Sequence, residues 1–280
     1  MADRVAIVTG AGRGLGRSHA LALAADGVAV VVNDVGDPTP VVEEIKAAGG
    51  EAVANSDGVD TWEGGQAIVD TALDNWGRLD VVVNNAGILR DVSFQKMTRE
   101  QVEDVMAVHL LGAFHVTHAA WPHLKERGGA VVMTASGSGI YGNFGQANYG
   151  AAKMGLVGLT RVLSIEGKKA GIRVNAIAPL ARTAMTEEIM PAEVLAKLDP
   201  EWISPLVAWL VRPDCPETGH IFSVAGGRYA RIAIVEGPGA VFDTVPSVDE
   251  LAAAHEQITT IEGFTEPKNL TDQITLVSGS

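Results

Sequence analysis

Short apolar runs and longer amphipathic segments alternate along most of this chain. The short runs are rich in Val, Ile and Ala and are bounded by Gly or polar residues, a pattern typical of strands buried on both faces. Between them, apolar residues recur at helical spacing. The pattern predicts strands near residues 4–9, 28–34, 51–55, 79–84, 129–134, 172–178 and 219–224. Strands that alternate with crossover helices predict an α/β fold, a Rossmann-type doubly wound sheet of seven parallel strands.

Length and composition favour one domain with a C-terminal extension. The 280 residues are 47% hydrophobic, enough for a substantial core, and no long linker divides them. After Gly226 the strand and helix alternation stops and Gly237-Pro238-Gly239 follows. We therefore expect a nucleotide-binding domain over 1–227. An extension over 228–280 should pack on the same domain or on a partner subunit, and residues 247–258 within it read as one helix.

A glycine-rich turn follows the first predicted strand. Val5 to Val8 lead into Thr9-Gly10-Ala11-Gly12-Arg13-Gly14-Leu15-Gly16, and a helical pattern comes next. Glycines allow a tight turn there and let the backbone approach a diphosphate closely, while the helix N-terminus offers unpaired N–H groups. This strand, turn and helix predict a dinucleotide site. Its candidate residues are Gly10, Arg13, Gly14, Leu15 and Gly16.

Asp34 ends the second predicted strand, eighteen residues after Gly16. A carboxylate at this spacing can bind a ribose diol, which favours NAD as the cofactor. The alternative interpretation is an ordinary Asp at a strand end. Arg13 favours NADP instead, because a guanidinium beside the turn can bind the 2′-phosphate of that cofactor. Asp34 would repel that phosphate, so we expect NAD, with Arg13 over the adenine or in solvent.

Tyr149 and Lys153 are the strongest candidates for chemistry. Residues four apart share one helix face, and a cationic Lys favours the phenolate of a neighbouring Tyr. Such a Tyr can exchange a proton with an alcohol. Ser136, thirteen positions earlier, adds a hydroxyl. A Tyr and a Lys at this spacing also occur as plain surface residues, but the glycine turn upstream favours an oxidoreductase.

These residues together resemble the short-chain dehydrogenase/reductase family. The resemblance rests on Asn84-Asn85-Ala86-Gly87 after an apolar run, and on Ser136, Tyr149 and Lys153 in the family order. It covers Arg4 to about Gly227. Within the family, the stretch from Ser138 to Tyr149 is similar to the (3R)-hydroxyacyl-CoA dehydrogenase unit of peroxisomal multifunctional enzyme type 2. The family topology implies strand order 3-2-1-4-5-6-7, with the cofactor across the carboxyl ends of the strands.

The resemblance implies a role for each candidate catalytic residue. Tyr149 would be the general base for alcohol oxidation and the general acid for ketone reduction. Lys153 would lower the pKa of Tyr149 and hold the nicotinamide ribose, while Ser136 would hydrogen-bond the substrate oxygen. Ser138 is a second serine nearby, but the thirteen-residue spacing favours Ser136. Hydride exchange with a nicotinamide cofactor requires no metal.

Further cofactor contacts follow from the same resemblance. Asp57 would face the adenine, although it can also cap its own loop. Asn85, Ala86 and Gly87 would shape the cofactor floor. Thr183 would bond the nicotinamide carboxamide. Thr186 is the alternative, because Pro179-Leu180 replaces the family's Pro-Gly and can alter the turn.

His109 stands where most of the family has an Asn. The acyl-CoA branch shares this His, and in the wider family the position supports a water-mediated proton path. Imidazole can donate and accept hydrogen bonds, so a catalytic role is possible. At helical spacing His109 also shares an apolar face with Val102, Met106 and Ala113, which favours a packed structural histidine equally well.

Charge restricts the partners. The formal net charge of −13 argues against nucleic acid, which requires a basic patch. A CoA substrate would need a local positive surface, and the candidates are Arg90, Lys96, Arg99, Arg228 and Arg231, unless these are merely solvated. We expect oxidation of a (3R)-hydroxyacyl-CoA. The alternatives are another secondary alcohol such as a hydroxysteroid, and a non-catalytic NAD-binding protein.

Location and assembly are expected from a few features. The single cysteine, Cys215, excludes an internal disulfide and is typical of a reducing compartment. No apolar run is long enough to cross a membrane, so we expect a cytoplasmic protein without a membrane partner. Small residues on the Tyr149 helix, Gly150, Ala151, Ala152, Gly155 and Gly158, allow close helix packing. We expect a homodimer or homotetramer, although packing within one chain would explain the same residues.

Overall fold

A computed structural model describes residues 3–180 and 198–278 of the chain. Its sheet has the order β3-β2-β1-β4-β5-β6-β7-β8, and the neighbouring pairs from β3 to β7 are parallel. The strands are β1 (Val5–Thr9), β2 (Ala29–Asn33), β3 (Ala52–Asn55), β4 (Val81–Asn84), β5 (Gly129–Thr134), β6 (Ile172–Pro179), β7 (Ile221–Ala225) and β8 (Arg228–Ile232). The predicted α/β doubly wound class is confirmed.

Burial on both faces explains why these short segments form strands. Every residue of β1, β2 and β4 is buried, and β-branched Val dominates all three. Branched side chains pack well on a pleated surface and lose little freedom there. The apolar runs in the sequence therefore located the strands to within about two residues.

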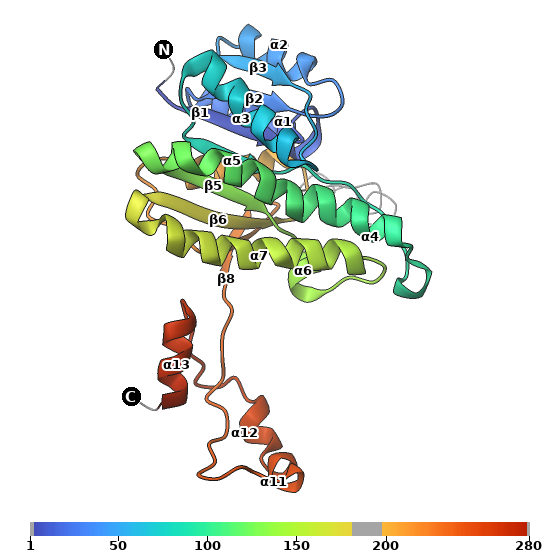
Figure 1. Cartoon of the computed structure of the whole chain (residues 1–280), viewed down its shortest axis with the longest axis vertical. Helices are drawn as coiled ribbons and strands as arrows, with labels where there is room; N and C mark the ends of the chain where they lie inside the picture. The colour runs from blue at the N-terminus through green and yellow to red at the C-terminus, as the bar shows by residue number, and fades with distance from the viewer. Residues whose placement is uncertain (1–2, 181–197, 279–280) are drawn as a thin grey trace. The chain divides into compact units, whose positions relative to one another are not determined.

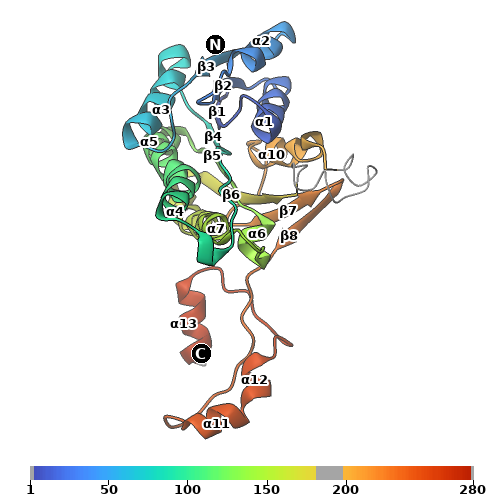
Figure 2. The same cartoon turned by 90° about the vertical axis from the view of Figure 1, so that its right-hand side faces the viewer.

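Helices cover both faces of the sheet (Figures 1 and 2). One layer contains α1, α2 and α10, and the other contains α3, α5 and α7. The helices of this part of the chain are α1 (Gly14–Ala25), α2 (Thr39–Ala47), α3 (Trp62–Trp76), α4 (Arg99–Met106), α5 (Gly112–Arg127), α6 (Gly137–Tyr141), α7 (Ala147–Gly167) and α10 (Ser204–Leu210). Single turns of other types are η1 (Phe94–Lys96), the π turn η2 (Ala107–Leu111), η3 (Lys168–Ala170) and η4 (Pro200–Trp202).

The first layer encloses a continuous apolar core. Leu23 of α1, Ile45 of α2 and Leu210 of α10 are fully buried against Val residues of the central strands. Burying one such side chain contributes roughly 1.5–3 kcal/mol. This packing fixes α1 against β1, so that the glycine turn between them has a defined position.

An eighth strand corrects the expectation of seven. Residues 226 and 227 are both Gly with positive φ, 51° and 82°, and they join β7 to β8 as a two-residue turn. Turns of this kind connect antiparallel neighbours. The sequence interpretation took these glycines as the end of the domain because the alternation of strands and helices stops there. They instead begin a hairpin that adds β8 at the edge of the sheet.

The strand order reverses between β1 and β4, and their carboxyl ends form the crevice where such sheets bind ligands. Thr9 ends β1, Asn33 ends β2, Asn84 ends β4 and Thr134 ends β5. The loops that follow these four strands carry Gly10, Arg13, Asp34, Asn85 to Gly87 and Ser136, while Tyr149 and Lys153 lie on α7 and His109 on η2.

The chain divides into two compact units, residues 1–231 and 232–280. The second unit contains α11 (Val248–Ala253), α12 (His255–Thr259), α13 (Leu270–Ser278) and a bridge between Glu236 and Thr265. The single helix expected over 247–258 is two helices that meet at Ala254. No side chain described between 232 and 276 is buried. Over the described ranges, no helix has both the length and the apolar character needed to span a membrane.

Candidate functional site

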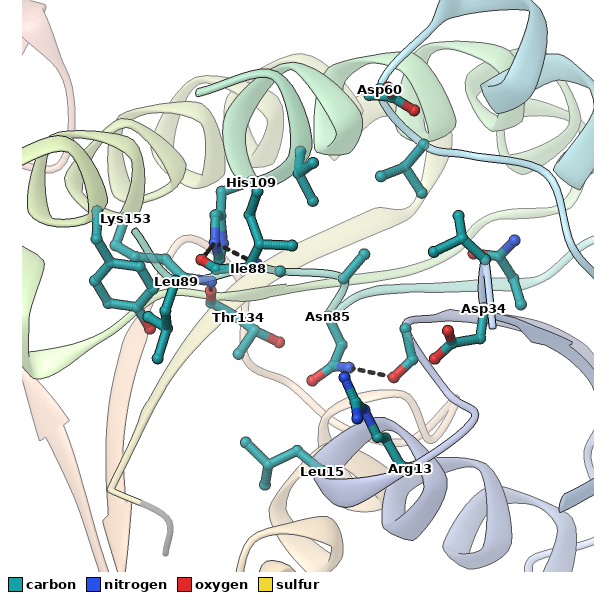
Figure 3. Close-up of a pocket in the computed structure, with 18 of the residues that line it drawn as sticks. Arg13, Leu15, Asp34, Asp60, Asn85, Ile88, Leu89, His109, Thr134 and Lys153 are labelled. Atoms are coloured by element: carbon teal, nitrogen blue, oxygen red, sulfur yellow. Dashed lines mark hydrogen bonds between the residues drawn. The ribbon is translucent and has the colours of Figure 1, made fainter. Parts of the chain in front are cut away.

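A cavity of about 650 Å³ lies over the carboxyl ends of the strands (Figure 3). We name its two ends by the residues that form them. The cofactor end is formed by Gly10, Arg13, Leu15, Asp34 and Asn85. The catalytic end is formed by Thr134, His109, Tyr149 and Lys153. Ser136 is not among the lining residues and is linked to this end by its hydrogen bond with Tyr149. A cavity of this size is typical of a small-molecule site.

Asp34 is held by backbone N–H groups at the cofactor end. Its Oδ2 accepts a hydrogen bond from Gly12 N at 2.9 Å, and its Oδ1 accepts one from Gly36 N at 2.9 Å. Each carboxylate oxygen can accept a second bond. Asp34 therefore has a fixed orientation and free acceptor capacity toward the cavity that it lines.

The loop after β4 is bonded to the glycine turn. Thr9 Oγ1 accepts hydrogen bonds from the N–H groups of Asn85 and Ala86, each at 3.0 Å. Asn85 Nδ2 in turn donates to the carbonyls of Thr9 and Gly10, at 3.0 and 3.1 Å. A Cβ at Gly16 would lie 2.1 Å from the Gly10 carbonyl oxygen, so only Gly fits where the first turn of α1 contacts the glycine turn. These contacts make one rigid floor from two loops.

The N-terminus of α1 suits an anionic ligand. Its N-cap residue Arg13 makes no side-chain bond to the first turn, and no acidic residue lies in that turn. The first N–H groups of a helix have no intrahelical partner and carry a partial positive charge. Gly14 has nothing within 4 Å of where a Cβ would stand. The residues present therefore fit the diphosphate of a dinucleotide.

Asp57 does not line the cavity, although the sequence placed it at the adenine. Its Oδ2 accepts a bond from Asn55 Nδ2 at 2.7 Å, and its carbonyl accepts one from Asn33 Nδ2 at 2.9 Å. Val59 and Asp60, two and three residues later, line the cavity instead. Gly14 and Gly16 are likewise absent from the lining, while Ala86 and Gly87 belong to it.

Ser136 and Tyr149 meet at the catalytic end. Ser136 is the N-cap of α6 and accepts a hydrogen bond from Ser138 N at 3.1 Å. Tyr149 lies in the first turn of α7. Burial raises the pKa of Tyr149 above its ordinary value, the hydrogen bond with Ser136 acts in the opposite direction, and the charge of Asp91 raises the pKa further. Of these three influences, the Ser136 hydrogen bond is the one that lowers the pKa of Tyr149.

Lys153 is buried one helical turn after Tyr149. Its Nζ donates to the Thr134 carbonyl and lies 5.5 Å from the centre of the Tyr149 ring. Burial lowers the pKa of Lys153 to about 7, because a desolvated ammonium is disfavoured. Near neutral pH this side chain can therefore exist in both protonation states. The sequence did not predict this property.

His109 lies in the π turn η2, between α4 and α5. Its ring meets the ring of Tyr149 edge to face, with 5.1 Å between centroids. Nε2 lies 2.7 Å from the carbonyl oxygen and 2.9 Å from the amide nitrogen of Ile88. Burial and then the nearby Lys153 charge lower the pKa of His109 to about 3, so the imidazole is neutral. It packs against Tyr149 and also lines the cavity.

Gly87 makes room for the His109 ring. A Cβ at position 87 would lie 2.3 Å from Cε1 of His109, far inside van der Waals contact. The Asn-Asn-Ala-Gly motif therefore ends in Gly because the imidazole occupies that space. His109 Nδ1 is buried and has no hydrogen-bond partner among residues 3–180 and 198–278.

Thr134 is a site residue that the sequence reasoning missed. It is the last residue of β5, it lines the cavity, and its buried Oγ1 has no partner within the part of the chain that the structure describes. The signal was available, because residues at the carboxyl ends of central strands face the ligand crevice. Thr183 and Thr186 lie outside the described residues.

Two of the cations expected near a CoA substrate are paired. Arg90 lines the cavity and contacts Asp104 at 3.3 Å. Arg99 lies 3.7 Å from Glu103. Both pairs are largely exposed, and such pairs contribute little stability, so the cations remain available to a phosphate.

The whole arrangement suits redox chemistry on an alcohol or ketone. One end of the cavity can hold a dinucleotide, and the other presents a phenol hydrogen-bonded to a serine beside a buried lysine. Such a phenol can take a proton from an alcohol or give one to a developing alkoxide.

Known proteins agree with this interpretation. The family model described as short chain dehydrogenase matches residues 4–194. The chain is 50% identical to a short-chain type dehydrogenase/reductase of Mycobacterium tuberculosis over 93% of this chain and 96% of that protein. It is 49% identical to mouse peroxisomal multifunctional enzyme type 2 over 85% of this chain, but spans only 34% of that protein.

A solved structure shows the same likeness in three dimensions. Full-length peroxisomal multifunctional enzyme type 2 of Drosophila melanogaster aligns with a TM-score of 0.88 and 37% identity, over 100% of this chain and 49% of that one. Members of the matched family use NAD or NADP. The chain belongs to the short-chain dehydrogenase family and is an oxidoreductase.

Proposed function

We propose that this protein oxidises a (3R)-3-hydroxyacyl-CoA to the 3-oxoacyl-CoA with NAD. The observation that carries the proposal is that Tyr149 and Lys153 line one cavity with the Asp34 carboxylate, while Ser136 hydrogen-bonds Tyr149. The bound nicotinamide would accept a hydride from the substrate carbon. Asp34, Asn85 and the N-terminus of α1 would hold the cofactor.

The proton chemistry belongs to Tyr149 and Ser136. In oxidation, the Tyr149 oxygen takes the hydroxyl proton of the alcohol, and in reduction it returns a proton to the alkoxide. The Ser136 hydroxyl, already hydrogen-bonded to Tyr149, also reaches the substrate oxygen and orients it. Fixed donors of this kind stabilise charge that develops in the transition state.

Lys153 and His109 support this centre in different ways. Lys153, fixed to the Thr134 carbonyl, can hold a ribose hydroxyl and pass a proton, because its pKa of about 7 permits both states. His109 is neutral and buried, so it acts by packing against Tyr149 and by offering Nδ1 as a hydrogen-bonding atom. Thr183, as expected from the family pattern, would bind the nicotinamide carboxamide.

NAD is proposed over NADP because of Asp34. A carboxylate fixed by two N–H groups accepts the two hydroxyls of an unmodified ribose and repels a 2′-phosphate. Arg13 lines the same end of the cavity and is the group that would favour NADP. The ratio of kcat/KM for the two cofactors tests this choice.

The acyl-CoA substrate is proposed from the resemblance and from the relatives. The mouse and fly proteins with which the chain aligns are named multifunctional enzymes of the peroxisome. Leu89, Phe94 and Phe144 add exposed apolar surface near the loops that resemble that branch, which suits an acyl chain. A hydroxysteroid or another secondary alcohol is the second candidate, because the same apolar surface accepts it.

We also propose a homodimer or homotetramer. A groove of about 500 Å³ between α5 and α7 is lined mostly by apolar side chains, including Phe114, Trp121 and Val162. A Cβ at Gly158 would meet nothing within 4 Å, whereas one at Gly155 would meet Leu110 of the same chain. Gly158 is thus the small residue available to a partner. Gly158→Arg should shift sedimentation toward the monomer, and Gly155→Ala is unsuitable because it disturbs the chain itself.

The extension and the location are proposals as well. Residues 228–280 would pack on the domain or on a partner subunit. Exposed apolar residues such as Val241, Val245 and Val248 would be removed from water by such packing. A cytoplasmic location is proposed from the free Cys215, although several relatives are named peroxisomal. Imaging of the tagged protein in its own cell distinguishes the two.

One assay tests the proposed activity. NADH formation is followed with a medium-chain (3R)-hydroxyacyl-CoA, the (3S) isomer and a hydroxysteroid, with Tyr149→Phe as the control. Turnover of the (3R) substrate that is lost in Tyr149→Phe supports the proposal. Turnover of the steroid alone would keep the mechanism and reject the substrate. NAD binding without any turnover would favour a non-catalytic protein.

A further inference from the structure

The loop after β4 is bonded to the segment that begins α7. Val92 N donates to the Gly145 carbonyl at 2.8 Å, and Asn148 Nδ2 donates to the Arg90 carbonyl at 3.3 Å. A third bond joins two side chains, because Gln146 Nε2 donates to Asp91 Oδ2 at 2.6 Å. Loop 90–92 and segment 145–148 therefore form one unit, and Tyr149 is the next residue.

Gln146 is fixed at both ends of its side chain. It is the N-cap residue of α7 and only 8% exposed. Its Oε1 accepts a bond from Asn143 Nδ2 at 3.0 Å, which leaves Nε2 to donate to Asp91. Its carbonyl accepts from Gly150 N at 2.7 Å, inside the first turn of the helix. The Asp91 carboxylate is thus fixed relative to Tyr149 by a buried residue.

The position of Asp91 also suits its charge. A carboxylate near the N-terminus of a long helix is stabilised by the helix dipole. α7 has 21 residues, and Asp91 bonds its N-cap side chain.

Three charged or titratable groups act on Tyr149 within the described ranges. Lys153 of its own helix and His109 of the π turn η2 contact its ring. Asp91 is bonded to Gln146 at the start of the same helix, and its charge raises the pKa of Tyr149. His109 is neutral near pH 7, and the Arg90 cation in the same cavity is paired with Asp104. Asp91 is therefore the one fixed negative charge of this set.

We propose that Asp91, fixed by Gln146, is a positioning residue that joins loop 90–92 to the start of α7 and sets the pH at which Tyr149 changes protonation. The proposal rests on the proposed role of Tyr149 as proton acceptor and donor. A negative charge favours the neutral phenol, so Asp91 displaces Tyr149 toward its acid form. The carboxylate thereby favours ketone reduction at a given pH and moves alcohol oxidation to higher pH.

Two substitutions separate the effect of the Asp91 charge from the effect of its hydrogen bond with Gln146. Asp91→Asn keeps an oxygen that can accept from Gln146 and removes the charge, and Gln146→Met removes the donor and keeps the charge. Asp91→Glu restores the charge. Glu103→Gln is the matched control, because it removes one negative charge from an exposed position on α4, where Glu103 contacts Arg99.

The first measurement is kcat/KM for alcohol oxidation as a function of pH. In Asp91→Asn the rising limb should move to lower pH by roughly half a unit, so the rate on that limb increases about threefold. Asp91→Glu should return the limb toward that of the wild type, and Glu103→Gln should leave it in place. Added salt should reduce the shift, because Asp91 is exposed. Gln146→Met should lower kcat/KM across the whole pH range and move the limb by less.

The second measurement does not need turnover. The phenolate of Tyr149 is titrated by ultraviolet difference absorbance, as the wild type minus Tyr149→Phe and as Asp91→Asn minus the corresponding double variant. Its midpoint should fall in Asp91→Asn. An unchanged midpoint and an unchanged rate profile would overturn the inference, even if Asp91→Asn lost stability. If Tyr149→Phe keeps full turnover, the proposed function fails instead, whatever Asp91 does.

Discussion

The two ends of the cavity use their polar groups differently. At the cofactor end, Asp34 and Asn85 are bonded to backbone groups of the protein itself. At the catalytic end, Thr134 Oγ1 and His109 Nδ1 are buried without partners among the described residues, and burial displaces the pKa values of Lys153 and Tyr149. Polar groups with hydrogen-bond partners fix the geometry of the cofactor end. Buried polar groups without partners raise the free energy of the catalytic end and remain available to a ligand.

The largest effect should come from Tyr149→Phe at the catalytic end. Loss of the phenolic oxygen removes the proton acceptor, so kcat should fall by about a thousandfold or more. The fold and cofactor binding should persist, because the cofactor end is untouched. Steady-state kinetics and a cofactor titration by fluorescence measure both. Cofactor binding that weakens as much as kcat would show that the two ends are not separable.

Lys153→Met should change how stability depends on pH. From pH 7 to the ordinary value near 10.5 the unfolded chain binds a proton on Lys153 that the folded chain releases, so stability rises with pH in that window. Between about pH 7 and pH 9 the rise should approach roughly 2 kcal/mol, and Lys153→Met should lack it. Urea unfolding at the two pH values tests this. Parallel changes in both proteins would assign the dependence to other groups.

Asp34→Ala addresses the cofactor end. The Gly12 and Gly36 N–H groups lose their acceptor and the ribose loses a charged partner, so kcat/KM for NAD should fall about 10- to 100-fold. Maximal kcat at saturating NAD should change little, because the catalytic end is intact. NADP should be affected less, since its phosphate no longer meets the carboxylate. An equal loss for both cofactors would argue against selection by Asp34.

Gly87→Ala tests the contact between Gly87 and the His109 ring, and its expected effect on kcat/KM is smaller than that of the preceding substitutions. The new Cβ would lie 2.3 Å from His109, and the strain should cost about 1–3 kcal/mol and lower kcat/KM roughly tenfold. In a His109→Ala background the same change should cost little, so a double-mutant cycle isolates the clash.

Much of the fold and of the site could be predicted because the relevant signals are local. Val-rich runs locate β1, β2 and β4, and the glycine turn followed by Asp34 locates the cofactor end. Helical spacing brings Tyr149 and Lys153 to one side of α7, and Ser136 forms a hydrogen bond with Tyr149. Each of these predictions uses residues that are close in sequence or that share one repeating geometry.

The remaining features depend on distant contacts. The side chain of Asp57 bonds Asn55, and only the tertiary packing decides that Asp60 lines the cavity in its place. The displaced pKa of Lys153 depends on complete burial, which no sequence spacing shows. The hairpin to β8 was missed because two glycines after a strand are equally typical of a domain end.

The contacts of His109 depend on the number of residues in the π turn at Ala107–Leu111. A π turn holds one residue more than the α turn it replaces, so side chains after it are rotated by about 100° relative to a continuous α-helix. His109 lies within this turn and reaches Ile88 and Gly87 from it. The arrangement therefore depends on the number of residues in the turn as well as on the imidazole itself. A one-residue deletion between Ala107 and Leu111 would remove it, whereas substitutions at those positions would keep the backbone count that produces it.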